Sequence, residues 1–118
     1  MLFVTKAGAQ ANCTVIFALH DNAHSYFVDE ARQLHTALLR QDIALLDLNH
    51  WQADAQPPFI SASGRQRHLL RQQYQIQDAA NQAVVIDRNG QQISRHVGSV
   101  TLVSAILNCP NPYNHNNN

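Results

Sequence analysis

Three polar side chains with the chemistry of a metal or acid–base site follow the first apolar run of the chain. His20 and Asp21 come directly after Leu19, and His24 follows three residues later. Two histidines four positions apart can share one face of a helix, and a nearby carboxylate can complete a metal-binding set. A purely structural role also fits, in which Asp21 caps a helix and both histidines are solvated. Both hypotheses stay open at this point.

The two cysteines, Cys13 and Cys109, offer a different chemistry. They form no CxxC motif and no Cys/His pair at zinc-finger spacing, so the sequence predicts no structural zinc site. We expect two independent thiols near the ends of elements. The alternative is a disulfide between them, which would close a long loop and favour export to an oxidising compartment.

A local basic cluster forms a third candidate site, for an anion or an acidic partner. Its residues are Arg65, Arg67, His68 and Arg71. The simpler interpretation is a solvated helix face. Eight Lys and Arg balance eight Asp and Glu over the whole chain, so no overall field steers it toward nucleic acid or an anionic membrane. We expect no nucleic-acid partner, no membrane partner and no cofactor, whereas a protein partner stays open.

The elements that would position these residues follow from the apolar pattern. The run Cys13–Leu19 is too apolar to alternate, which is typical of a central strand covered on both faces. Helical spacing then predicts a helix over about 23–40, capped by Asp21 or Asn22, and residues 42–48 predict a second strand. Strand, helix and strand form a βαβ unit, so the two strands should be parallel. The helix residues expected to face the sheet are Phe27, Ala31, Leu34 and Leu38.

A loop over 50–62 separates this unit from a second, shorter helix. Ser63 is the expected cap of that helix, which should end at about 71–73. Its inward residues are expected to be Leu69 and Leu70.

A β-hairpin and a final helix complete the predicted order. The hairpin spans about 83–96, and Asn89-Gly90 supplies the positive φ values that a tight turn requires. Ser99 is the expected cap of the last helix, which Pro110 ends. The residues of that helix expected to face inward are Leu102, Val103, Ile106 and Leu107.

The resulting order, β-α-β-α-β-β-α, resembles the core of the thioredoxin-like fold, a three-layer α/β/α sandwich with a mixed sheet. More narrowly, the chain resembles a set of short bacterial chains classed as domain-of-unknown-function family 4174, over about Thr14 to Pro110. The segments that carry the resemblance are Val15-Ile16-Phe17-Ala18, Leu39-Arg40-Gln41-Asp42, Leu70-Arg71-Gln72-Gln73-Tyr74 and Val84-Val85-Ile86-Asp87-Arg88-Asn89-Gly90.

This resemblance implies a fold without an established activity. In thioredoxins the redox cysteines lie between the central strand and the first helix, where Asp21 and His24 stand in this sequence. The segment 79–83, before the hairpin, also lacks the cis-proline that flanks a thioredoxin site. Both absences argue against an oxidoreductase.

We therefore expect one thioredoxin-like domain over 1–109 and a disordered Pro/Asn-rich tail over 110–118. Apolar residues make up 45% of the 118 residues, enough for a core, and no apolar run approaches the roughly 20 residues that span a bilayer. The stretch Met1–Ala11 is too short and too weakly apolar for a signal peptide. The localisation therefore stays open between the cytoplasm and, if a leader has been removed, the periplasm.

The leading functional hypothesis is a non-catalytic binding or interaction module. Its surface would lie near the loop after the first strand and the 50–62 loop, where Trp51 and Phe59 could form an apolar patch. The alternative is a metal-binding or enzymatic site at His20, Asp21 and His24.

Overall fold

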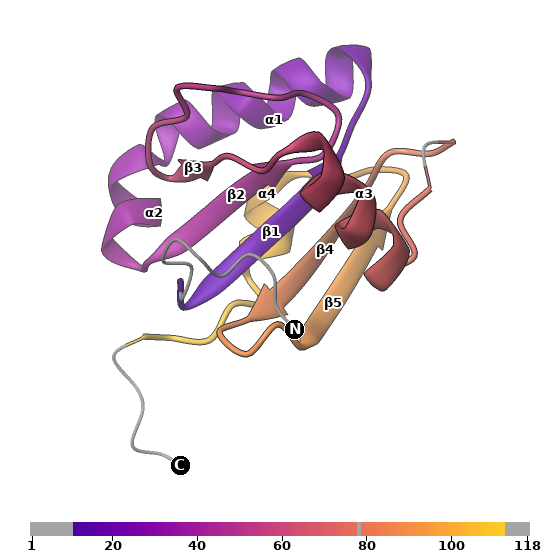
Figure 1. Ribbon diagram of the computed structural model, residues 1–118. Coiled ribbons are helices and arrows are strands. Elements are labelled where there is room, and N and C mark those ends of the chain that lie inside the picture. Colours follow the sequence, from indigo (N-terminus) through magenta and orange to yellow (C-terminus); the bar gives the residue numbers. More distant parts are fainter. Residues whose placement is uncertain (1–10, 78, 113–118) are drawn as a thin grey trace.

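A mixed five-stranded sheet runs through the protein, with helices on both of its faces (Figure 1). The computed structural model describes residues 11–77 and 79–112. Within them the elements are β1 (Cys13–Ala18), α1 (Asp21–Gln33), α2 (His35–Arg40), β2 (Ile43–Asp47), β3 (Phe59–Ile60), α3 (Gly64–Gln73), β4 (Gln82–Asp87), β5 (Gln92–Val97) and α4 (Leu102–Ile106). Residues 113–118 of the predicted tail, and 1–10 of the N-terminal stretch, lie outside the described residues.

The sheet has the strand order β3-β2-β1-β4-β5. β1 pairs in parallel with β2, as the βαβ unit predicted, and in antiparallel with β4. β4 and β5 form the predicted C-terminal hairpin, and β3 adds a short parallel edge strand to β2. The 50–62 segment, which was predicted as a loop, therefore contains the strand β3. This strand has only two residues, too few for the apolar pattern to identify it.

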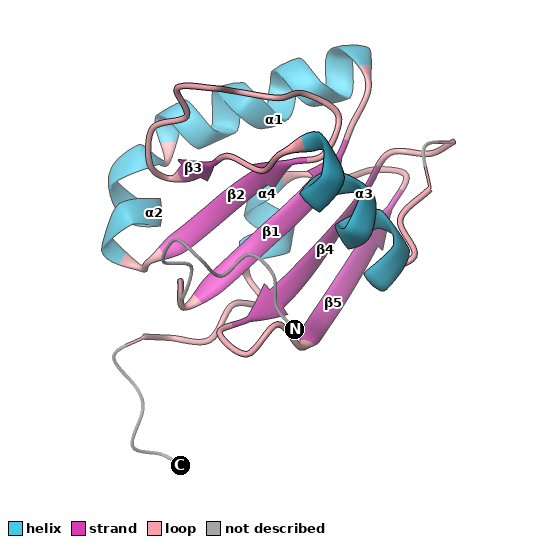
Figure 2. Cartoon of the chain, viewed as in Figure 1, coloured by secondary structure: helices cyan, strands magenta, loops and turns pink. Residues whose placement is uncertain are grey.

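β1 occupies the centre of the sheet because both of its faces are apolar, and all six of its residues are buried. Cys13, Val15 and Phe17 pack on the face covered by α1, α2 and α4. Ile16 and Ala18 pack on the opposite face, which α3 covers. Figure 2 shows α3 in front of the sheet and α4 behind it.

The first predicted helix is divided in two at Leu34, which separates α1 from α2. The break is slight, because the Leu34 N–H still donates to the Glu30 carbonyl and the Leu34 carbonyl accepts from Leu38. Neither Asp21 nor Asn22 caps the helix, so that expectation was wrong. The helix begins earlier, at an N-cap His20 without a side-chain cap bond, and Asp21 lies inside its first turn with a positive φ of 48°. Three of the four expected inward residues, Phe27, Ala31 and Leu38, are buried, and Leu34 is half-buried.

α3 begins as predicted, at Ser63. The Ser63 hydroxyl accepts from the Gln66 N–H, and the Gln66 side chain accepts from the Ser63 N–H, which makes a capping box. Leu70 is buried, but Leu69 is 49% exposed. Neighbouring helix positions point about 100° apart, so only one of the two leucines can face the sheet.

The hairpin turn is longer than the tight turn that Asn89-Gly90 predicted, because β4 ends at Asp87 and β5 begins at Gln92. Among residues 88–91, which connect β4 to β5, only Gly90 has a positive φ, at 82°. The carboxylate of Asp87 accepts the N–H groups of Asn89 and Gln91 at 2.8 and 3.0 Å, and the Gly90 N–H donates to the Asp87 carbonyl. Because the Asp87 side chain satisfies these donors, the chain makes a longer connection with glycine in the left-handed position.

α4 begins at Leu102 rather than near Ser99. Thr101 is its N-cap and accepts from the Ser104 N–H, and the Glu30 carboxylate of α1 accepts from the Leu102 N–H at 2.7 Å. The predicted inward face was wrong for two of its four residues, Val103 and Leu107. Leu102 and Ala105 are buried, whereas Val103 and Leu107 are exposed and Ile106 is half-buried.

A disulfide joins Cys13 to Cys109, so the two cysteines are not independent thiols in the structure. It links the start of β1 to the segment after α4, across a sequence separation of 96. The side chain of Asn12 reinforces the same connection by donating to the Pro110 carbonyl at 2.7 Å. None of the described helices is long and apolar enough to cross a bilayer.

Candidate metal centre

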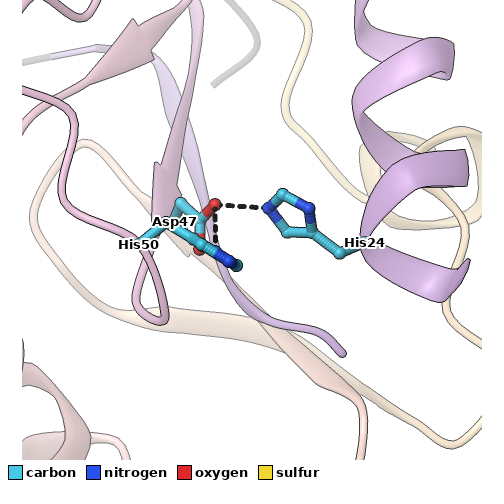
Figure 3. Close-up of side chains that lie close together, drawn as sticks. All are labelled: His24, Asp47 and His50. Atoms are coloured by element: carbon cyan, nitrogen blue, oxygen red, sulfur yellow. Dashed lines mark hydrogen bonds and ion pairs between the residues drawn. The ribbon is translucent and has the colours of Figure 1, made fainter. Parts of the chain in front are cut away.

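Three side chains with metal-ligating atoms converge where β2 ends and α1 begins (Figure 3). Asp47 is the last residue of β2, His24 lies in the first turn of α1, and His50 follows β2 by three residues. Because β1 and β2 are parallel, their carboxyl ends lie at one edge of the sheet, and α1 starts from that edge. The topology therefore brings together residues that are 23 and 26 positions apart.

The alternation of β2 decides which way Asp47 points. Ile43 and Leu45 pack in the core between the sheet and α1, and Asp47 continues that series two residues further on. Its carboxylate is therefore directed to the α1 side. His24 lies on the same side of the sheet and contacts the carboxylate there. The ring of His24 also lies beside the ring of Phe17, which is the register partner of Asp47 in β1.

The distances within the cluster are those of direct polar contacts. Nε2 of His24 lies 2.6 Å from Oδ2 of Asp47, and Nδ1 of His50 lies 3.2 Å from the same oxygen. The two imidazole rings are 4.2 Å apart between centroids. One ligand atom from each residue can be chosen so that all lie within 4.8 Å of one another.

The carboxylate at the centre of this cluster is buried and fully partnered. The side chain of Asp47 is 3% exposed, against 21% for His24 and 52% for His50. A buried carboxylate is costly unless charged or polar partners surround it. Besides the two imidazoles, the backbone N–H of Asn49 donates to Oδ1 of Asp47 at 3.0 Å. The protein thus fixes the orientation of the carboxylate before any ligand arrives.

Two imidazoles and one carboxylate form a donor set that suits a transition metal. In a tetrahedral site, metal–ligand bonds of about 2.0–2.2 Å place neighbouring ligand atoms roughly 3.4 Å apart around the ion. The His50 contact is close to this spacing, whereas the His24 contact must open by about 1 Å. Three protein ligands leave at least one coordination position open, and the exposure of His50 indicates that this position faces solvent.

An open pocket of about 490 Å³ adjoins His50. It is backed by Leu19 and Leu48, and its polar wall consists of His20, Asp21, Asn49, His50, Arg67 and Arg71. NH1 of Arg67 and NH2 of Arg71 both donate to the Leu48 carbonyl, at 3.2 and 3.0 Å. Arg71 also donates to Oδ1 of Asn49 at 2.6 Å. These bonds attach the loop that contains His50 to helix α3.

The sequence-based candidates are distributed over the cluster and this pocket. His24 belongs to the cluster, while His20 and Asp21 lie on the pocket wall. Arg67 and Arg71 of the basic cluster also line the pocket, and Arg65 is exposed elsewhere on α3. The Cys13–Cys109 disulfide lies at the other end of β1, about 16 Å away along the strand.

Sequence reasoning missed Asp47 and His50. The available signal was a carboxylate within the apolar run 43–48, at the end of a strand predicted to lie parallel to β1. Parallel strands end at the same edge of a sheet, so Asp47 was placed to meet the residues after β1.

No protein-family model and no curated protein matches the chain. The chemistry of the site is therefore inferred from its side chains. In residues 11–77 and 79–112, His24, Asp47 and His50 form the one group of three His, Cys, Asp or Glu residues close enough to hold an ion.

Proposed function

We propose that this protein binds a divalent transition-metal ion through His24, Asp47 and His50, and that it does so as a thioredoxin-like domain without thiol chemistry. The observation that carries the proposal is the convergence of three ligand atoms within 4.8 Å around a buried carboxylate. Imidazole nitrogen favours zinc, copper, nickel or ferrous iron over calcium and magnesium, which prefer oxygen ligands.

The pairing of the strands supports the thioredoxin-like part of the proposal. The order β2-β1-β4-β5 combines a parallel pair with an antiparallel hairpin, and helices cover both faces. This combination of strand pairing and layers supports a thioredoxin-like domain, with the division of the first helix and the short β3 as departures from the expected order. In such a domain the loop between β1 and the first helix is the usual place for a functional site.

The cysteines support binding rather than disulfide exchange. Cys13 is fully buried at the start of β1, and it is joined to Cys109 far from the loop that precedes α1. A thiolate nucleophile needs exposure, and Cys13 has none, while Cys109 is half-buried. The disulfide instead supports a structural role in an oxidising compartment.

The preformed contacts of Asp47 favour a resident ion. In the metal-free cluster each imidazole donates a hydrogen bond to the carboxylate, whereas a metal ion needs the ligating nitrogens unprotonated. Binding therefore replaces two N–H donors by one cation at the same carboxylate. Asp47 thus keeps a favourable partner in both states, and only the side chains of the cluster need to move.

Isothermal titration calorimetry tests the proposal. The full chain, without a polyhistidine tag and stripped of metal, is titrated with Zn²⁺, Co²⁺ and Ni²⁺. We expect one ion per chain, and a loss of affinity of more than about 100-fold in His24→Ala, because even the loss of a residue that only hydrogen-bonds to a metal ligand costs roughly 10–100-fold.

The matched control is His68→Ala, which removes an exposed histidine of α3 outside the cluster. Its affinity should equal that of the unsubstituted protein. Equal weakening in both variants, or no saturable binding of any of the three ions, would refute the proposal. Far-ultraviolet circular dichroism of each variant verifies that it is folded.

A further inference from the structure

We infer that the pocket beside His50 binds a small oxyanion, a phosphate or a carboxylate group, through the guanidinium group of Arg67. The pocket is open to solvent and has a volume of about 490 Å³, which is ample for such a group. Nothing in this inference requires a metal ion at the neighbouring cluster.

The charges on the pocket wall favour an anion. Two guanidinium groups, of Arg67 and Arg71, face a single carboxylate, that of Asp21, among the residues that line the pocket. His20 and His50 contribute neutral or positive imidazoles. Arginine presents a planar fork of donors that fits the oxygens of phosphate and carboxylate groups.

Arg67 has a donor that lacks a partner. Its Nε is buried and makes no hydrogen bond, although its NH1 donates to the Leu48 carbonyl. Within the described part of the chain, the ion pairs of the carboxylates do not include Arg67. A buried N–H without an acceptor is unfavourable, so the guanidinium group of Arg67 keeps unused donor capacity beside the pocket that this residue lines.

The side chain is also held in place before the ligand arrives. Arg67 and Arg71 donate to the same carbonyl of Leu48, which holds both guanidinium groups in place beside the pocket. Binding then costs little of the side-chain entropy that a free surface arginine would lose. This arrangement distinguishes Arg67 from Arg65, which is exposed on the same helix.

Nuclear magnetic resonance titration of the metal-free full chain tests the inference. Inorganic phosphate and malonate are added in separate titrations at constant ionic strength, and the Nε–Hε signal of Arg67 is followed. We expect a saturable shift of this signal with at least one of the two anions. The anion that binds more tightly identifies the oxyanion class.

Two variants and a control decide the role of Arg67. Arg67→Gln should weaken binding at least about tenfold, because a charged donor is removed. Arg67→Lys keeps the charge but loses the fork and the Nε donor, so it should weaken binding to a smaller extent. Arg65→Gln, on the exposed side of α3, should bind as the unsubstituted protein does.

A shift that does not saturate, or equal weakening in Arg65→Gln and Arg67→Gln, would overturn the inference. If Arg67→Gln does not fold, then unchanged affinity in Arg67→Lys overturns it. Because the titrations use metal-free protein, this result is independent of whether His24, Asp47 and His50 bind an ion.

Discussion

Nε2 of His24 and Oδ2 of Asp47 lie 2.6 Å apart and join the first turn of α1 to the last residue of β2. The contact gives a hydrogen-bond donor to a carboxylate that is almost completely buried, because the alternation of β2 directs it to the α1 side of the sheet. The same contact holds two of the three proposed metal ligands in place. Structure and proposed function therefore depend on one pair of atoms.

Removal of the Asp47 carboxylate should destabilise the fold. In Asp47→Ala the donors of His24, His50 and Asn49 lose their acceptor, so we expect the free energy of unfolding to fall by about 1–3 kcal/mol. Urea denaturation of the metal-free protein measures the change. Asp54→Ala, at an exposed position of the 50–62 segment, should change it by less than about 0.5 kcal/mol. Equal effects of the two substitutions would show that the contacts of Asp47 do not support the fold.

The Cys13–Cys109 disulfide should make a large contribution to stability. It closes a loop over a sequence separation of 96, which restricts the unfolded chain, and loss of such a bond costs about 2–5 kcal/mol. Thermal unfolding with and without a reductant measures this effect. The reductant should lower the melting temperature of the unsubstituted protein and leave that of the Cys13→Ala/Cys109→Ala double variant unchanged. An unsubstituted protein that is insensitive to full reduction would contradict the prediction.

Tyr74 should couple stability to alkaline pH. Burial raises the pKa of its phenol above the usual 10.0, and the nearby Asp87 carboxylate raises it further. The folded state thus prefers the protonated phenol, which donates to the Gly90 carbonyl at 2.5 Å. Its contribution is complete below about pH 10, where the unfolded-state phenol also stays protonated, and is lost as the pH rises through the higher folded-state pKa.

The pH dependence of unfolding between pH 8 and 12 measures this coupling. We expect the slope above pH 10 to be shallower in Tyr74→Phe, which has no phenol to ionise there. Tyr26→Phe, at an exposed position, should keep the slope of the unsubstituted protein. A Tyr74→Phe variant with an unaltered alkaline slope would contradict the assignment.

The apolar pattern predicted the larger elements because burial determines them. β1 and β2 were found from continuous apolar runs, and the inward positions of α1 from helical spacing. The same reasoning failed in α4, where Val103 and Leu107 are exposed. Five residues of helix are too few for the spacing of apolar residues to identify the buried face.

The candidate site was only partly predictable, for a related reason. His24 was identified because it lies close to His20 and Asp21 along the chain. Asp47 and His50 join it only through the parallel pairing of β1 with β2, a contact between distant segments. Local spacing carries no record of such a contact, which follows only from the pairing of the two strands.

The most direct test of the metal centre is a zinc titration of the metal-free chain followed in histidine ring ¹H–¹⁵N spectra. The account predicts saturation at one Zn²⁺ per chain, with shifts of the ring nitrogens of His24 and His50 while the exposed His35 and His68 stay unmoved. Shifts confined to other histidines, or no saturable shift at His24 and His50, would contradict it.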